Sequence, residues 1–404
     1  MYVWATASKI KSDKYGSFII SLKDVKNKPL KGKTISVSVP SINKVYKVIT
    51  NSSGKAKLSL NSYKTSSIKV KFSGGSKYYS KTVKSKISVT QVKVSFKNAI
   101  KASILLRDYV INNKKLPATV SVNGSTYTAA QVSYLTLSVI KNVKNKNHNS
   151  IVLVPVKAPS KSVGTEIYDT VYKKNYLSLV NNGLSSMIKN HVAPTYLTYS
   201  SYKIKYNLYT MAFSRVVGFY KDNNRLPNYR LFTSSEFVKV PNNSNKYTFY
   251  LTSDNIAGKK SDTKMLKKLA ATLKSMGYNA VIVGVGPDIH NIAYQYGCVG
   301  SKSVLLCCFG GVDVGCIEEW ADELWGPNNA FNRNYGNVHV LGLWYTKPYG
   351  ASSSLYTKVG RAWDADYGWA LNTPANYMNK HGISYMQTST VNKACNLLKT
   401  SKIM

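Results

Sequence analysis

Several side chains able to act as acids, bases or nucleophiles follow apolar runs in the last part of the chain. The runs have the length of β-strands and lie at residues 247–251, 280–285, 304–309 and 338–343. In an open parallel sheet, ligands bind outside the carboxyl ends of the strands, so the loops after these runs should converge. The candidate catalytic residues in these loops are Asp288, His290, Asp313 and Cys316. The candidate ligand-loop residues are Asp254, Gly310, Gly311 and, one turn into the following helix, Glu318.

Two kinds of chemistry are compatible with these residues. Cys316 stands at a predicted helix N-terminus, where the helix dipole favours a thiolate nucleophile. An alternative triad of Cys316, His339 and Asp364 has the order found in transglutaminase-like cysteine peptidases, although His339 falls at the start of its strand. The glycine pair resembles the metal-binding motif of wall amidases, but Phe309 stands where that motif has its histidine. We therefore expect no metal site and no cofactor, and a divalent cation held by Asp364 and Asp366 is the open alternative.

The elements that must position these loops are alternating strands and helices. Residues 262–276 are apolar at helical spacing, begin at Asp262 and are followed by Gly277, which is typical of a helix. This helix lies between two apolar runs of strand length. A strand, helix, strand order with continuously apolar strands predicts a parallel, doubly wound sheet. The sequence therefore predicts a C-terminal α/β domain over residues 245–404.

A short motif recurs in the middle of the chain. Residues 112–117 read NNKKLP, residues 223–229 read NNRLPNY, and a weaker copy lies at residues 189–196. Asparagine adopts the left-handed conformation at low cost and proline cannot continue a helix, so each copy should end a helix. After the first copy, two short strand-like runs flank Asn123-Gly124, which predicts a β-hairpin, and Thr128 should begin another helix.

The motif and its aromatic neighbours resemble the pseudomurein-binding repeat of methanogen surface proteins and of wall-cleaving enzymes carried by their viruses. The resemblance extends over residues 98–143, 166–200 and 201–235. It implies attachment to pseudomurein, the peptide-crosslinked glycan wall of some methanogens. The side chains implied in wall binding are Tyr109, Asn113, Lys115, Tyr196, Asn223, Arg225 and Tyr229. The aromatic ones either stack on sugars or pack within the repeat, while Lys115 and Arg225, at matching positions, are candidates to pair with carboxylates of a peptide crosslink.

Residues 1–92 have the pattern of an all-β domain. Short alternating runs are separated by turn signals such as Asn51-Ser52-Ser53-Gly54, which predicts an immunoglobulin-like sandwich. Residues 24–33 and 77–79 resemble the immunoglobulin-like repeats of methanogen adhesin-like proteins. In that family the domain is a spacer that holds a functional end away from the wall.

The charge of the chain favours an acidic polymer as partner. Among 404 residues, 56 are Lys or Arg and 17 are Asp or Glu, giving a formal net charge of +39. No nucleic-acid recognition motif accompanies this charge, so the expected partner is pseudomurein or another anionic wall polymer rather than nucleic acid. No apolar run has the length of a transmembrane segment, and the start lacks a signal-peptide pattern. We expect an extracellular, wall-associated or virion-associated chain, either a fragment of an exported protein or released by lysis.

The combined prediction is a multidomain protein. Its fold class is an N-terminal all-β immunoglobulin-like sandwich, a central mostly helical repeat region and a C-terminal α/β doubly wound parallel sheet. The leading functional hypothesis is a non-catalytic, adhesin-like wall-binding protein of a methanogenic archaeon or its virus, with a ligand-binding α/β domain. The alternative is a wall hydrolase, a pseudomurein endopeptidase or amidase, that the repeats deliver to its substrate.

Overall fold

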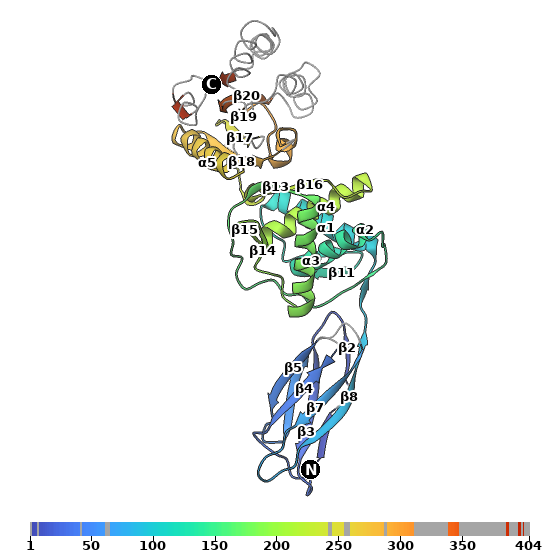
Figure 1. Ribbon diagram of the computed structural model, residues 1–404. Coiled ribbons are helices and arrows are strands. Elements are labelled where there is room, and N and C mark those ends of the chain that lie inside the picture. The colour runs from blue at the N-terminus through green and yellow to red at the C-terminus, as the bar shows by residue number, and fades with distance from the viewer. Residues whose placement is uncertain are drawn as a thin grey trace.

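The computed structural model describes most of the first 310 residues and short segments beyond them. The described residues are 2–5, 8–40, 43–60, 65–240, 245–253, 259–286, 289–310, 338–346, 385–387, 395–396 and 399. In Figure 1 the blue N-terminal part consists of strands, and the cyan and green middle part contains helices. The yellow and orange part beyond it again contains strands, with one long helix beside them.

The N-terminal strands form two sheets. They are β1 (Tyr2–Ala5), β2 (Ser8–Lys11), β3 (Gly16–Lys23), β4 (Thr34–Val39), β5 (Lys44–Ile49), β6 (Lys55–Leu60), β7 (Ser66–Phe72) and β8 (Lys81–Thr90). Within the described residues the sheet orders are β1-β3-β6 and β2-β8-β7-β4-β5. Side chains along β4 and β7 alternate between buried and more exposed positions, as expected for strands with one face on a core. The buried faces form one hydrophobic cluster that includes Phe18, Ile20, Ile35, Val37 and Val70.

The central residues alternate helices with pairs of short antiparallel strands. The elements are β9 (Lys93–Val94), α1 (Phe96–Asn113), β10 (Thr119–Val122), β11 (Ser125–Thr128), α2 (Ala129–Lys144), β12 (Ile151–Val152), β13 (Tyr168–Tyr172), α3 (Lys173–Asn190), β14 (Tyr196–Tyr199), β15 (Tyr202–Lys205), α4 (Tyr206–Asn223), β16 (Tyr229–Thr233) and the 3-10 helix η2 (Ser234–Phe237). They form two units of the same order, which we call the first unit (residues 93–152) and the second unit (residues 168–233). In each unit a hairpin joins two helices, and the first strand pairs with the last, β9 with β12 and β13 with β16.

Local sequence explains the hairpin of the first unit and the helix that follows. Asn123 and Gly124 have φ of 47° and 78°, as a two-residue turn between antiparallel strands requires. Thr128 and Gln131 form a capping box at the start of α2, in which each side chain accepts a hydrogen bond from the other residue's backbone amide. The predicted β10–β11 hairpin and the predicted helix start are confirmed.

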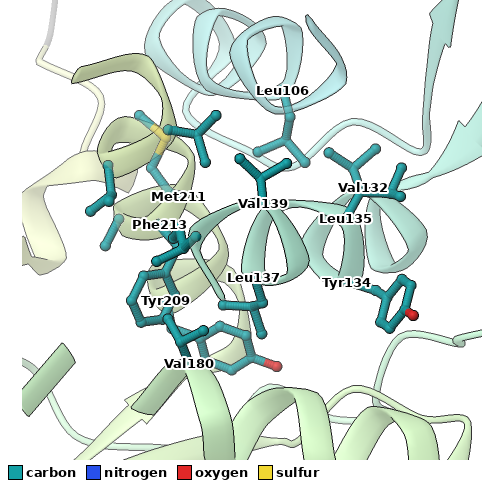
Figure 2. Close-up of a cluster of buried hydrophobic side chains, with 14 of the residues drawn as sticks. Leu106, Val132, Tyr134, Leu135, Leu137, Val139, Val180, Tyr209, Met211 and Phe213 are labelled. Atoms are coloured by element: carbon teal, nitrogen blue, oxygen red, sulfur yellow. The ribbon is translucent and has the colours of Figure 1, made fainter. Parts of the chain in front are cut away.

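One hydrophobic core joins the two units. Helix α2 is buried on all sides from Ala129 to Ile140, which is typical of a central helix. Figure 2 shows Leu106 of α1, Val180 of α3 and Phe213 of α4 arranged around α2. Burying each such side chain contributes roughly 1.5–3 kcal/mol. The helices of both units therefore stabilise one another.

The last described strands join the second unit in one mixed sheet. Its further elements are β17 (Thr248–Ser253), α5 (Lys259–Ser275), β18 (Asn279–Val285), η3 (His290–Tyr296), β19 (Ser303–Gly310), β20 (His339–Thr346) and β21 (Tyr385–Gln387). Within the described residues the sheet order is β16-β13-β18-β17-β19-β20-β21. β16 is antiparallel to β13, whereas β13 and the strands beyond it are parallel to their neighbours.

The fold class predicted from the sequence is wrong. The central region is not a mostly helical repeat region, because each of its helices alternates with paired strands. The C-terminal sheet is not a separate, doubly wound parallel sheet, because it is mixed and includes β13 and β16 from the central region. Apolar patterns predict strands but not their partners, and the pairing of Asp169 with Val285 joins residues far apart in the chain.

The joint between β18 and the second unit has little free space. A methyl group on Gly284 of β18 would lie 2.6 Å from Cδ1 of Leu231 in β16. We expect Gly284→Ala to lower the free energy of unfolding by about 1–3 kcal/mol, because overpacking forces side chains off their rotamers. In a Leu231→Ala background the added methyl has room, so its cost should fall toward zero. Denaturant unfolding of the four chains of this double-mutant cycle measures the coupling, and additive costs would contradict the packed joint.

Candidate functional site

The three motif copies end their helices with the same backbone cap. In each copy the residue after the last helical asparagine is left-handed, and its amide donates to the carbonyl four residues earlier at 2.8 or 2.9 Å. The capping residues are Lys114, His191 and Asn224, with φ of 54°, 54° and 51°. The motif therefore reverses the chain at the same point after each helix.

The prediction that asparagine adopts the left-handed conformation is wrong in the copies at residues 112–117 and 189–196, where Lys114 and His191 adopt it. Asn113 is instead the last helical residue, and its side-chain amide donates to the carbonyl of Tyr109 at 2.9 Å. Asn223 donates in the same way to the carbonyl of Phe219 at 3.0 Å. Each side chain thus bonds back to a carbonyl in the last turns of its own helix. Asn113 and Asn223, two of the predicted wall-binding residues, thus hold their own helices.

A second backbone hydrogen bond fixes the loop after each proline. The first amide of a helix donates to the carbonyl of the residue that follows the proline. The donor and acceptor pairs are Ala129 and Ala118 at 3.2 Å, Tyr206 and Thr195 at 3.0 Å, and Lys173 and Asn228 at 2.8 Å. In the last two loops a tyrosine hydroxyl also donates to the proline carbonyl, from Tyr209 to Pro194 at 2.9 Å and from Tyr176 to Pro227 at 2.6 Å. The three loops therefore share one backbone arrangement.

Lys115 and Arg225 are the exposed cations of this arrangement. They occupy the same position, one residue after the left-handed cap, and both side chains are exposed. The guanidinium carbon of Arg225 lies 5.0 Å from the centre of the Phe219 ring, a cation–π contact that orients the side chain. Tyr109, the residue of the first copy that matches Phe219, is half-buried. The first and third loops thus present a positive charge to solvent.

Tyr196 and Tyr229 lie at matching positions on strands that follow the prolines. Tyr196 is 37% exposed, and the amino group of Lys203 on the paired strand lies 5.1 Å from its ring centre. Tyr229 is half-buried and meets Tyr172 edge to face, with ring centres 6.3 Å apart. Tyr172 is 50% exposed. Both strand pairs therefore place an aromatic face next to the start of a helix.

The middle loop is covered by the N-terminal region. His191 is 5% exposed, and its Nδ1 lies 3.2 Å from the hydroxyl of Tyr15, which comes from the turn between β2 and β3. The two rings meet edge to face at 5.7 Å, and the Lys157 amino group lies 5.6 Å from the Tyr15 ring centre. Burial, and then the nearby Lys44, lower the pKa of His191. This loop is an internal contact rather than a free binding surface.

A buried ion cluster ties the second unit to η3. Arg215 of α4 donates two hydrogen bonds to the carboxylate of Glu236, at 2.7 and 2.9 Å, and Arg230 of β16 donates a third at 3.2 Å. Arg230 also donates to the hydroxyl of Tyr296 in η3 at 2.9 Å. Burial lowers the pKa of Lys114, and the nearby negative charge of Glu236 opposes that shift. The apolar spacing of the sequence gave no signal for this cluster, because its acid and bases lie in different elements.

The predicted catalytic and ligand loops are only partly described. Asp254, Asp288, Gly311, Asp313, Cys316, Glu318 and Asp364 lie outside the described residues. His290 begins η3 and Gly310 ends β19, next to Thr346 at the end of β20. His339, of the alternative triad, pairs with Val304 at the opposite end of the same two parallel strands. A strand of this length separates the two ends by about 20 Å.

The described part of the sheet's carboxyl edge contains two buried acids that the sequence reasoning missed as site residues. Ser253, at the end of β17, donates to Asp262 in the first turn of α5 at 3.0 Å. Asp169 of β13 pairs with Val285 at the same edge. Among the described residues, no group of three or more His, Cys, Asp and Glu side chains is placed to hold a metal ion.

The described cysteines are buried thiols rather than exposed nucleophiles. They are Cys298, Cys307, Cys308 and Cys395. Burial raises the pKa of Cys298, with the neighbouring Cys307 adding to this shift. A raised pKa disfavours the thiolate, so Cys298 is not activated for nucleophilic attack.

We expect the stability of the chain to fall in mild acid because of His191. Its lowered pKa means that the unfolded chain, with an ordinary histidine pKa of about 6.5, takes up the proton first as the pH falls. The free energy of unfolding should therefore decrease from about pH 7.5 to about pH 5.5. His191→Asn keeps a residue suited to the left-handed cap, as Asn224 shows, and should flatten this dependence. Urea midpoints of both chains across that range provide the measurement, and identical pH slopes would refute the role of His191.

Comparisons with known proteins leave the chain without an assigned family. No protein-family model matches it, and no curated protein is significantly similar to it. Within the described residues, no helix has both the length and the apolar character needed to cross a membrane.

Proposed function

We propose that the chain is a wall-binding, adhesin-like surface protein whose ligand is pseudomurein or another anionic wall polymer. The observation that carries the proposal is the matching position of two exposed cations, Lys115 and Arg225, in loops whose backbones are held in the same way. A cation held at a fixed backbone position is suited to a carboxylate on a repeating polymer. The organism is a methanogenic archaeon or its virus, and the chain acts outside the cell.

Aromatic side chains beside exposed cations support a polymer that also contains sugars. The Phe219 ring lies under Arg225, and the exposed Tyr196 lies beside Lys203. Apolar faces of sugar rings stack on such aromatic side chains, while the adjacent cations attract acidic groups. A wall polymer with both glycan and peptide carboxylates matches this combination.

The net charge of +39 supports the same partner class at longer range. A surface of one sign raises the rate of encounter with a polyanion and does so less at high salt. Long-range attraction alone would not distinguish one lysine from another. A specific site therefore has to be tested with variants of equal net charge.

The test is sedimentation of the full chain with purified, insoluble wall material. We expect Lys115→Ala with Arg225→Ala to weaken retention about tenfold, the effect of losing two contacts worth about 0.7 kcal/mol each. The matched control is Lys55→Ala with Lys57→Ala, which removes two exposed lysines from β6 of the N-terminal region. This control changes the net charge equally and should retain nearly all binding.

Two results would overturn the proposal. The wild-type chain would stay in the supernatant at moderate ionic strength, or the two double variants would lose retention equally. Amines or reducing ends released into the supernatant would favour the wall-hydrolase alternative over binding alone.

A further inference from the structure

The strand pairs next to the three motif loops have equivalent backbones. Their registers place Thr119 opposite Thr128, Tyr196 opposite Lys205 and Tyr229 opposite Tyr172. Equivalent positions in the three pairs are therefore held by Thr126 of β11, Lys203 of β15 and Thr170 of β13. The hydrogen bond from the first helix amide to the residue after the proline shows which residue pairs along the two strands are hydrogen-bonded and which are not. Antiparallel pairs alternate, so the amide and carbonyl of this position point away from the partner strand, toward the outer edge.

Two of the three outer edges are occupied by the chain itself. On β15, the Thr165 amide donates to the Lys203 carbonyl at 2.9 Å, and the Lys203 amide donates to the Thr165 hydroxyl at 3.0 Å. On β13, the edge is taken by β18 in parallel orientation, and the Thr170 hydroxyl donates to the Val285 carbonyl at 3.1 Å. In both cases the added segment is extended and runs parallel to the strand.

The segment on β15 also pairs with the second motif loop. The Lys157 amide donates to the His191 carbonyl at 2.9 Å, and the Ala193 amide donates to the Lys157 carbonyl at 2.8 Å. Residues 157–165 thus run from the motif loop to the strand edge. They use the carbonyl of the left-handed cap His191, the amide of Ala193 and the backbone of Lys203.

The first unit offers the same backbone groups without such a segment. The matching groups are the Lys114 carbonyl, the Leu116 amide and the amide and carbonyl of Thr126. In the part of the chain that the structure describes, no strand or bridge pairs with the outer edge of β11. Ser125 and Thr126 are exposed, whereas Tyr202, which matches Ser125, is half-buried. Lys115, exposed, stands where the second unit has Val192.

We propose that the outer edge of β11 binds an extended peptide that carries carboxylates, in parallel orientation, with Lys115 pairing with one of them. The occupant is a peptide because extended polypeptide fills the two equivalent edges, and strand addition to an edge depends on main-chain hydrogen bonds. Carboxylates are expected because Lys115 replaces an apolar residue at the point where the segment enters. The inference rests on the proposed function and deepens it, since it makes the peptide part of the wall polymer the ligand of the first unit.

The test compares two proline variants of the same strand pair in the full chain. Thr126→Pro removes the amide that points to the outer edge of β11. Ser121→Pro is the matched control, because Ser121 is opposite Thr126 and its amide points to the other edge. Both variants lose the same hydroxyl contact, which joins Ser121 and Thr126 at 3.0 Å. Proline is tolerated at sheet edges, and thermal unfolding of each variant checks that the fold is kept.

The probe is a synthetic peptide of residues 157–167 with Lys157→Glu and Lys161→Glu, titrated by calorimetry or NMR. We expect saturable binding that Thr126→Pro weakens at least about tenfold and Ser121→Pro changes by less than about twofold. Lys115→Glu, which leaves the backbone intact, should weaken binding severalfold and serves as the second variant if Thr126→Pro unfolds. Absence of saturable binding, or equal affinity for the two proline variants, would overturn the inference.

Sedimentation with wall material separates this inference from the proposed function. Retention of the wild-type chain with equal retention of Thr126→Pro would refute the peptide edge and leave wall binding intact. Failure of the wild-type chain to sediment would refute wall binding, while the peptide titration would still decide whether β11 accepts a strand.

Discussion

The arrangement of the central region depends on one backbone constraint, the hydrogen bond between the first amide of a helix and the carbonyl after a motif proline. The left-handed cap reverses the chain, the proline prevents the helix from continuing, and this bond then closes the strand pair onto the next helix. In the second unit this bond occurs twice, once at the β14–β15 hairpin and once at the pair of β16 and β13. Because Tyr176 bonds to Pro227, the end of α4 is fixed to the start of α3. The positions of Lys115 and Arg225 follow from that closure.

The same strand pair serves three different neighbours. The pair of β14 and β15 receives the chain's own linker, the pair of β16 and β13 continues into the mixed sheet, and the pair of β10 and β11 has an exposed edge. The cluster of Arg215, Glu236 and Arg230 lies where the second unit meets η3, and buried ion pairs of this kind fix geometry more than they add stability. The second unit is therefore built into the molecule on two sides. Within the described residues, the outer edge of β11 in the first unit has no such pairing.

Local sequence predicted local structure well where one residue type has one physical role. A two-residue hairpin turn requires positive φ at both positions, so Asn123-Gly124 predicted the hairpin. Thr128 predicted the helix start, where it forms a capping box with Gln131. The left-handed caps at Lys114 and His191 were missed, because the preceding asparagines stay helical and bond back to their own helices. The pairing between distant strands was also missed, since the apolar residues of β13 do not indicate which strand lies beside them, and that strand is β18. The acids Glu236 and Asp262 were not identified as buried partners because their bonding groups come from other elements. The candidate catalytic loops lie largely outside the described residues and stay predictions.

The central claim is that the chain meets a wall polymer at the motif loops of Lys115 and Arg225 and at the hairpin edge of the first unit. Hydrogen–deuterium exchange of the full chain, with and without soluble wall fragments, tests this claim most directly. We expect the fragments to slow exchange over residues 114–128 and 224–229, with little change in the N-terminal strands. Unchanged exchange over both segments, with protection confined to other parts of the chain, would contradict the claim.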